Sequence, residues 1–360
     1  MQSKPHVLII YGPTGVGKTD FALQIASQIP AEIVNMDVGQ MYAPLTIGTA
    51  KPDLNSVTVP HHCFDLLNTP EHFTVTAYRA LCETVIQDIW KRGKVPILVG
   101  GSGFYLKSLF FPPQQIDSVD SLVDSAELIE NSENNSEDNV DSAHLWQQLY
   151  DIDPDRAEKI NIKDTYRIKR ALTIWRTTGK KPSECKPQFD PISDAHIVFL
   201  TRDRKELYDR INQRVDQMMD EGWLEETKAL LNTPWEQFIQ HKKLIGYNEL
   251  VDFLRTPELV TDKQSALYNH TKGTVISTDI NTVLTGIKQR TRHYAKRQCT
   301  FWRMFADMCA GEQQDADATH CASLWLDTVN LTLQPIHLYS NQLYIKQLAQ
   351  ALMVYKNNKL

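Results

Sequence analysis

The chain has 360 residues, of which 42% are hydrophobic and 23% charged, and its formal net charge is -6. These proportions exclude a fibrous or wholly disordered protein, and the length indicates more than one hydrophobic core. No apolar stretch is long enough to cross a bilayer and the short apolar run near the start is unlike a secretion signal, so we expect a cytoplasmic protein with no membrane partner.

The first predicted unit is a strand, a glycine-rich turn and an amphipathic helix. The apolar run over 7–11 predicts the strand, and GPTGVGKT then matches the pattern GxxxxGK[ST] in full. In such a loop the backbone N–H groups point inward, a lysine adds positive charge and a hydroxyl can bind Mg²⁺. We therefore predict a di- or triphosphate site, without knowing what the phosphates carry, at Gly12, Pro13, Thr14, Gly15, Val16, Gly17, Lys18 and Thr19.

Two further strands are predicted, over 31–36 and 94–101, and a helix follows the second over 103–110. Strands that alternate with helices indicate a parallel sheet with its chemistry at the carboxyl edge. Asp37 follows the first of these strands, so its carboxylate is either a general base or the cap of the next turn. Gln40 has an amide that can pair with an adenine edge. No convincing later strand of four apolar residues ends in the aspartate typical of an ATPase, since the strand over 94–101 ends in glycines.

An acidic segment divides the chain. Residues 113–142 contain nine Asp or Glu and no Lys or Arg, which predicts a mobile insert and leaves the rest of the chain at about +3. Helical patterns resume after it. We therefore divide the chain into the first part of a P-loop core, the insert, a helical insertion domain that returns to the core, the second part of the core, and a tail with a closing helix: 1–112, 113–142, 143–200, 201–310 and 311–360.

The second part of the core ends in a basic helix, predicted over 278–303. Six basic residues are interleaved there with His293, Tyr294 and Trp302. Basic and aromatic residues on one helix favour nucleic-acid binding, whereas the simpler interpretation is a solvated charged face.

Several segments together resemble one family, the tRNA dimethylallyltransferases or tRNA isopentenyltransferases (IPP transferases). The similar segments are GPTGVGKT, DVGQMY, IGTAKP, VPHHCFD, GGSGFYLKSL, YRIKRAL, LIGYNEL and TRHYAKRQCTFWR, in that order between 7 and 303. The resemblance implies a P-loop NTPase-like α/β fold, a parallel sheet flanked by helices with an inserted all-helical lobe. It also implies transfer of a dimethylallyl group from dimethylallyl diphosphate to N6 of adenosine 37, beside the anticodon, in tRNAs that read codons beginning with U.

The resemblance also implies roles for single residues. Asp37, Ser102 and Lys18 correspond to catalytic positions, and Arg214 joins the diphosphate loop. Mg²⁺ on Thr19 is the expected cofactor, and a monomer is the expected state. The tRNA contacts would come from Asp37, Val38, Gly39, Gln40, Tyr166, Arg167, Arg170, Lys243, Gly246, Tyr247, Lys288, Arg290, Arg292, Lys296, Arg297 and Gln298.

Three other functions remain open at this point. A small-molecule kinase shares the strand, loop and helix and would transfer phosphate from ATP. A prenyltransferase acting on free AMP or ADP would keep the donor but not the RNA. An RNA-binding protein with a vestigial loop would have no turnover.

Overall fold

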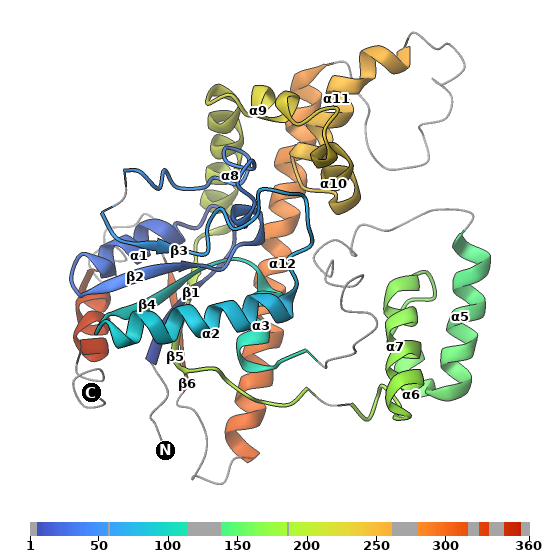
Figure 1. Cartoon of the computed structure of the whole chain (residues 1–360), viewed down its shortest axis with the longest axis horizontal. Helices are drawn as coiled ribbons and strands as arrows, with labels where there is room; N and C mark the ends of the chain where they lie inside the picture. Colours follow the sequence, from blue (N-terminus) through green and yellow to red (C-terminus); the bar gives the residue numbers. More distant parts are fainter. Residues whose placement is uncertain are drawn as a thin grey trace.

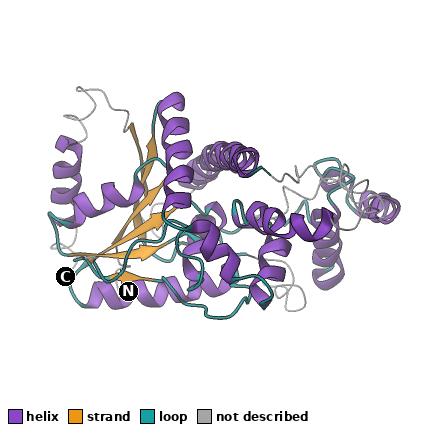
Figure 2. Cartoon of the chain, turned by 90° about the horizontal axis from the view of Figure 1, so that it is seen from above, coloured by secondary structure: helices purple, strands orange, loops and turns teal. Residues whose placement is uncertain are grey.

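The chain folds around one parallel sheet. The structure is a computed structural model, and it describes residues 6–56, 58–113, 138–185, 187–260, 279–315, 324–330 and 342–353. The sheet has the strand order β3-β2-β4-β1-β5-β6, and every pairing is parallel. Helices lie on both faces of it (Figure 2). The predicted α/β fold is thus confirmed, with strands β1 (His6–Tyr11), β2 (Ala31–Asn35), β3 (His61–His62), β4 (Val95–Gly100), β5 (Asp194–Thr201) and β6 (Leu324–Asn330).

The apolar run at the start of the chain forms the central strand β1. All six of its residues are buried because helices cover both faces of the sheet, so the strand is continuously apolar rather than alternating. Val7 and Ile9 face one hydrophobic core, and Leu8 and Ile10 face the other. This burial fixes the register, since a slip by one residue would exchange the two faces.

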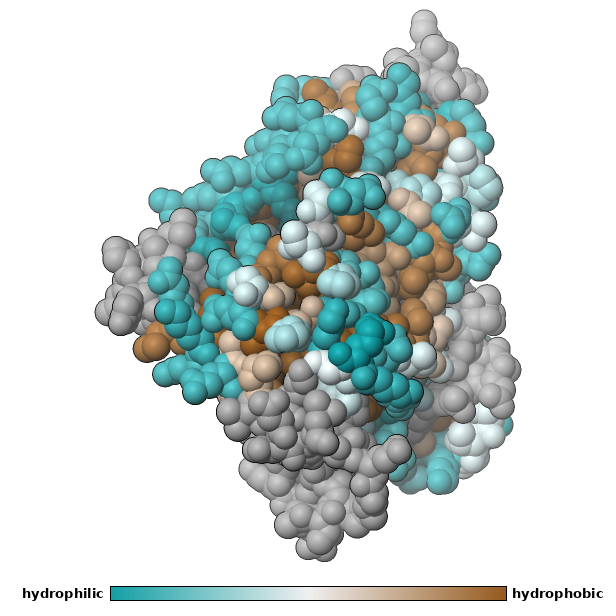
Figure 3. Space-filling view, turned by 60° about the vertical axis from the view of Figure 1, so that its left-hand side comes forward, coloured by the Kyte–Doolittle hydropathy of each residue, from teal (hydrophilic) through white to brown (hydrophobic). Residues whose placement is uncertain are grey.

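Different helices cover the two faces. One core contains apolar side chains of α2 (Val75–Lys91) and α3 (Gly103–Phe110) and the later turns of α12 (Ile280–Asp315). The other contains those of α1 (Lys18–Ala26), the first turns of α8 (Arg204–Asp220) and the helical residues 342–353. The face in Figure 3 mixes hydrophobic with hydrophilic residues instead of presenting a continuous apolar surface.

A third core lies beyond the carboxyl edge of the sheet. It joins the later turns of α8 to α9 (Trp223–Ala229), α10 (Pro234–Lys242) and α11 (Tyr247–Val260). The 36-residue α12 passes from this core alongside the sheet (Figure 1), and at 1.5 Å per residue it is about 54 Å long. Val283 of this helix belongs to the third core, and Phe305 belongs to the core that α2 and α3 form against the sheet. One helix therefore connects the outer helices with the sheet.

The inserted helices form a separate lobe, as Figure 1 shows. They are α5 (Asp138–Ile152), α6 (Pro154–Ala157) and α7 (Thr165–Thr178), and they share a small core of their own. The Trp146 indole donates hydrogen bonds to the carbonyls of Ala157 and Ile160, at 3.0 and 3.1 Å. Most of the predicted acidic insert lies outside the described residues, and its last residues begin α5.

The predicted tail contributes a strand as well as the closing helix. β6 pairs with β5 along its whole length, a strand that sequence patterns did not indicate. Asp327 on β6 accepts a hydrogen bond from the Tyr344 hydroxyl at 2.6 Å and contacts Nε2 of His196 on β5 at 2.7 Å. The segment is thus tied into the sheet. Within the described parts of the chain, no helix has both the length and the apolar character needed to span a membrane.

A buried carboxylate ties two strands together at the amino end of the sheet. Glu32 contacts Arg92 and His62 at 2.6 Å each and Lys94 at 2.7 Å, and these partners lower its pKa to about 2. Glu32→Ala removes the carboxylate that His62, Arg92 and Lys94 share, although Arg92 keeps its pair with Asp88. Because these partners are partly exposed, we expect a loss of about 2 kcal/mol in the free energy of unfolding.

The pH dependence of stability checks the same interaction. Because the folded pKa of Glu32 is depressed, its contribution is present above the unfolded pKa of about 4.3 and is lost as pH falls toward 2. Urea unfolding at pH 7 and at pH 3 measures the contribution of Glu32 to the free energy of unfolding. The difference between wild type and Glu32→Ala should be smaller at pH 3, and an equal difference at both values would contradict this role of the ionised carboxylate.

Candidate functional site

The glycine-rich loop connects β1 to α1, as predicted. Gly15 and Gly17 have φ angles of 79° and 105°, in the left-handed region that glycine adopts without strain. Gly17 caps α1 without a side-chain hydrogen bond, so the first N–H groups of the helix are available to an anion. Gly12 packs against β5, where a Cβ would lie 2.8 Å from the Leu200 carbonyl oxygen.

Lys18 folds back over this loop. Its ammonium donates hydrogen bonds to the carbonyls of Gly12 and Pro13, both at 3.0 Å. Burial lowers the pKa of Lys18 to about 8, an effect that the nearby Asp37 carboxylate partly opposes. The loop therefore holds a positive charge in place at the amino end of α1.

Asp37 is held by its neighbour Asn35, a residue that sequence reasoning missed. The Asn35 amide donates to the carbonyls of Asp37 and Cys63, at 2.9 and 3.0 Å, and its Oδ1 accepts the Asp37 N–H at 2.9 Å. Asp37 Oδ1 also accepts the Gly39 N–H at 3.3 Å, so the capping interpretation holds too. Burial raises the pKa of Asp37, and Lys18 opposes the shift. A partly buried carboxylate with a raised pKa suits a general base.

Ser102 supports the backbone that follows Asp37. Its buried hydroxyl accepts the Val38 N–H at 3.3 Å, and it lines neither of the two cavities described below. Gly100 lets the end of β4 approach the end of β2, since a Cβ there would lie 2.0 Å from the Met36 carbonyl oxygen. We infer that Ser102 positions the backbone beside Asp37.

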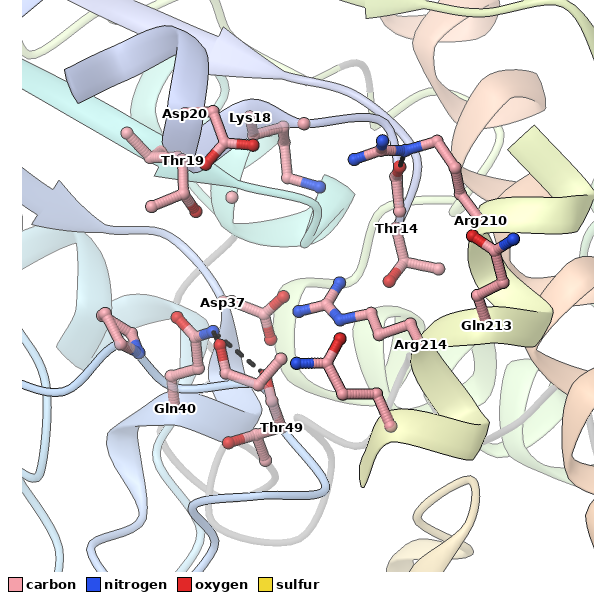
Figure 4. Close-up of a pocket in the computed structure, with 17 residues that line it drawn as sticks. Thr14, Lys18, Thr19, Asp20, Asp37, Gln40, Thr49, Arg210, Gln213 and Arg214 are labelled. Atoms are coloured by element: carbon pink, nitrogen blue, oxygen red, sulfur yellow. Dashed lines mark hydrogen bonds between the residues drawn. The ribbon is translucent and has the colours of Figure 1, made fainter. Parts of the chain in front are cut away.

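A polar cavity of about 440 Å³ opens between the loop and α8. In Figure 4, Lys18, Asp37 and Arg214 point into it from three different elements. Arg214 was predicted there from family resemblance, and burial lowers its pKa while Asp37 opposes the shift. Three cations thus face two carboxylates, which suits an anionic ligand; the charged lining residues are Lys18, Asp20, Asp37, Arg210 and Arg214.

Two arginines on the α8 side were not predicted. Arg210 Nε donates to the Gly15 carbonyl at 2.8 Å, and Arg202 Nε donates to the Val16 carbonyl at 3.0 Å. These bonds take loop carbonyls and so do not compete for the loop N–H groups, of which those of Thr14 and Val16 are bonded within the protein. No short-range pattern could reveal them, because each partner lies more than 180 residues away.

A second cavity, of about 200 Å³, adjoins the first and is largely apolar. Thr14, Asp37, Thr49 and Arg214 line both, so the carboxylate stands where the two spaces meet. Two basic side chains and a tyrosine also reach the second cavity. Its apolar wall comes from Val38, Ile211, Val215, Met218, Trp223, Leu244, Ile245 and Tyr247, and its other side includes Lys243, Tyr294 and Arg297.

A partly buried carboxylate on α9 holds the wall of the second cavity. Glu226 accepts the Ile47 N–H at 2.8 Å and the Tyr247 hydroxyl at 2.5 Å. Gly48 and Gly246 pack on Trp223, where added Cβ atoms would lie 2.0 and 1.9 Å from the indole. These contacts explain the glycines of IGTAKP and LIGYNEL, and Glu226 was not predicted.

Several predicted RNA-contacting residues are used inside the protein. Gln40 Nε2 donates to the carbonyls of Thr49 and Ala50, at 3.0 and 3.1 Å, so its donor is unavailable for the expected pairing with an adenine edge. Gly246 and Tyr247 belong to the cavity wall. Lys243 and Gly39 line the second cavity as well.

Some basic side chains of α12 pair with neighbouring helices, and others are exposed or line a cavity. Lys288 pairs with Asp216 at 2.5 Å, Arg290 pairs with Glu249 at 2.9 Å, and Arg292 donates to Asn212 at 2.7 Å. These contacts attach α12 to α8 and α11, which neither the RNA interpretation nor the solvated-face interpretation included. Lys296 is exposed, Arg297 reaches the second cavity, and Gln298 is buried. In the lobe, Arg167 pairs with Asp164 at 3.2 Å and Arg170 donates to Tyr166 at 3.5 Å.

The described residues offer no ready-made metal cage. They contain no group of three or more His, Cys, Asp or Glu side chains placed to hold an ion. Thr19 and Asp20 line the polar cavity, and an oxygen pair of this kind suits Mg²⁺, which retains water and binds through a phosphorylated substrate.

Comparison with known proteins gives a consistent result. The profile of the IPP transferase family matches residues 40–305. A tRNA dimethylallyltransferase of Petrotoga mobilis is 37% identical over 301 residues, covering 82% of this chain and 90% of that protein. One from Bacillus cereus strain ATCC 14579 is 34% identical over 322 residues, covering 88% and 92%.

Solved structures agree with this result. The tRNA isopentenylpyrophosphate transferase of Bacillus halodurans matches with a TM-score of 0.57 and 28% identity, covering 99% of this chain and 98% of that one. A eukaryotic dimethylallyltransferase, described as acting on tRNA, matches with a TM-score of 0.68 and 25% identity, covering 98% and 80%.

Proposed function

This chain belongs to the IPP transferase family, and we propose that it transfers the dimethylallyl group of dimethylallyl diphosphate to N6 of adenosine 37 in tRNA. The observation that carries the proposal is the position of Asp37 at the junction of a cationic cavity and a largely apolar one. The reaction needs a diphosphate site, an adenine site and a base between them, and the two cavities provide this order.

The donor diphosphate fits the polar cavity. The amino end of α1 faces it, and Lys18 and Arg214 supply positive charge. As the allylic C–O bond breaks, negative charge moves onto the diphosphate, so groups already placed there stabilise the transition state more than the ground state. The hydrocarbon then lies toward Asp37 and the apolar space.

The acceptor adenine fits the second cavity. Apolar and aromatic side chains offer a surface for the base, and Lys243, Tyr294 and Arg297 line its other side. An adenine in the anticodon loop must leave the stack to enter, which costs a few kcal/mol that a single-stranded loop reduces. The exposed Lys296 and the lobe arginines Arg167 and Arg170 are the proposed RNA contacts outside the cavity.

The transfer step conserves atoms and charge. N6 of adenine attacks the allylic carbon, and the new N–C bond forms as the C–O bond breaks. The electron pair of that C–O bond leaves with the diphosphate, and the N6 proton moves to Asp37. A bound Mg²⁺ would neutralise charge on the diphosphate, with Thr19 and Asp20 as the protein groups that would hold it.

Incubation with labelled substrates tests the proposal. Dimethylallyl diphosphate labelled in the hydrocarbon, an unmodified tRNA anticodon stem-loop, AMP and labelled ATP are supplied separately and together. The proposal is supported if the stem-loop becomes labelled from the prenyl donor and not from ATP. Transfer of phosphate from ATP would instead show a kinase, preference for AMP would show an adenylate prenyltransferase, and RNA binding without turnover would show a vestigial site.

The pH dependence of the rate follows from two ionisable groups that line the polar cavity, Asp37 and Lys18. Activity needs Asp37 ionised and Lys18 protonated, so kcat/KM for the donor should fall on the acid side as Asp37 protonates and on the alkaline side above a pKa of about 8. Initial rates between pH 4.5 and 9.5 measure both limbs.

Lys18→Arg provides the control for the alkaline limb. Arginine keeps its charge throughout this range, so the limb should disappear or move upward in a slower enzyme. An alkaline limb that stays near pH 8 in Lys18→Arg would contradict its assignment to Lys18.

A further inference from the structure

One side chain of α12 is joined to the phosphate loop. Gln298 is 4% exposed, and its Oε1 accepts the Thr14 N–H at 2.8 Å while its Nε2 donates to the Gly101 carbonyl at 3.0 Å. Both functions of the amide are therefore satisfied by backbone groups from two different loops. One is the phosphate loop after β1, and the other is the Gly-Gly turn after β4.

The surrounding residues leave the amide little room. A Cβ on Gly101 would lie 2.1 Å from Gln298 Nε2, so the turn must be glycine for this contact to form. One turn further along α12, the Phe301 ring packs on Gly103, where a Cβ would lie 2.5 Å from it. The Tyr11 hydroxyl donates to the Gln298 carbonyl at 3.4 Å. The contact between the Gln298 amide and the two loops is thus enclosed by packed neighbours.

The same face of α12 also reaches the second cavity. Thr291 and Tyr294 line that cavity, and spacings of three and four residues place them on the side of the helix that carries Gln298. The helix therefore contacts the proposed adenine space and the proposed diphosphate loop through one row of side chains.

We propose that Gln298 is a positioning residue of the transfer reaction, which sets the phosphate loop for the diphosphate group from the helix that also lines the adenine space. It takes one loop N–H, that of Thr14, out of the anion cradle and fixes that end of the loop against the turn after β4. The Val16 N–H donates to the Pro13 carbonyl at 3.3 Å, so the diphosphate would meet the uncapped first N–H groups of α1 beside Lys18. This proposal rests on the proposed function, since it needs the loop to bind diphosphate.

Binding of inorganic diphosphate, measured by calorimetry in the full-length protein, tests the proposal without turnover. Gln298→Met keeps the length of the side chain but neither accepts from Thr14 nor donates to Gly101, and we expect binding about tenfold weaker at pH 6 and pH 8 alike. Binding of an anticodon stem-loop should change less than about twofold, because the basic side chains of α12 remain.

Gln298→Glu gives the sharper result. An ionised carboxylate still accepts the Thr14 N–H but has no proton for the Gly101 carbonyl, whereas a protonated one reproduces both bonds. Burial raises the pKa of such a carboxyl above its ordinary value. Relative to wild type at the same pH, diphosphate binding should be about tenfold weaker at pH 8 and should recover to within about threefold at pH 6.

The control is Gln289→Glu, which puts the same charge on an exposed position of α12 and should change diphosphate binding less than about twofold at either pH. The proposal would be overturned if a folded Gln298→Met variant bound diphosphate as tightly as wild type. It would also be overturned if the weakening of diphosphate binding in Gln298→Glu were the same at pH 6 and at pH 8. If Gln298→Met does not fold, the pH dependence of Gln298→Glu decides alone. Failure of wild type to bind diphosphate would instead overturn the proposed function.

Discussion

Asp37→Asn is expected to lower kcat for prenyl transfer by about 10²- to 10⁴-fold, the range typical of a lost general base. The substitution removes the proton acceptor and little else. Asn35 holds the backbone of residue 37 rather than its side chain, and an Asn Oδ1 can still accept the Gly39 N–H. Single-turnover transfer to an anticodon stem-loop measures the rate, and calorimetry measures the binding of stem-loop and diphosphate, which should not weaken.

The matched control is Asp220→Asn, at the exposed end of α8. It removes the same charge away from both cavities and should leave the rate unchanged. A rate for Asp37→Asn within about threefold of wild type would exclude general-base catalysis by this carboxylate, since that role contributes at least about a hundredfold.

Lys18→Met is expected to lower kcat/KM for the donor by about 10²- to 10³-fold, as removal of a preorganised charge does in other transition states with a developing anion. The lysine is partly buried and bonded to two carbonyls of its own loop, so its ammonium is already in place before the ligand arrives. Steady-state rates over a range of dimethylallyl diphosphate, at saturating stem-loop, separate the effect on kcat from that on KM.

Lys91→Met, at the exposed end of α2, is the control for loss of a lysine charge and should behave as wild type. Thermal unfolding of Lys18→Met distinguishes lost chemistry from a collapsed loop. Unchanged kcat/KM in a folded Lys18→Met would mean that the diphosphate binds elsewhere.

The parts of the site that were predictable are those whose groups are close together in the chain. The strand, loop and α1 follow from eight consecutive residues, because one turn of backbone supplies all the N–H groups of the cradle. Asp37 follows directly from the end of an apolar strand. Family resemblance added Arg214 and Ser102, which no local pattern singles out.

The parts that were missed depend on partners far away in the chain. Gln298 was expected to contact RNA, and its bond to Thr14, 284 residues away, was not foreseen. Arg210 is 195 residues from the loop carbonyl that it holds. The charges of α12 show the same difficulty, because composition cannot tell a lysine that binds RNA from one that pairs with Asp216 on a neighbouring helix. Strand β6 was missed because its pairing partner β5, not its own pattern, defines it.

The position of β6 bears on how the protein is made in the cell. Synthesis proceeds from the amino end, and β1, β4 and β5 can associate as soon as residues up to 201 have left the ribosome. The outer edge of β5 then has no partner until residues 324–330 emerge, more than a hundred residues later. Throughout that interval the nascent chain carries an open strand edge, the kind of surface that promotes association between unfinished chains.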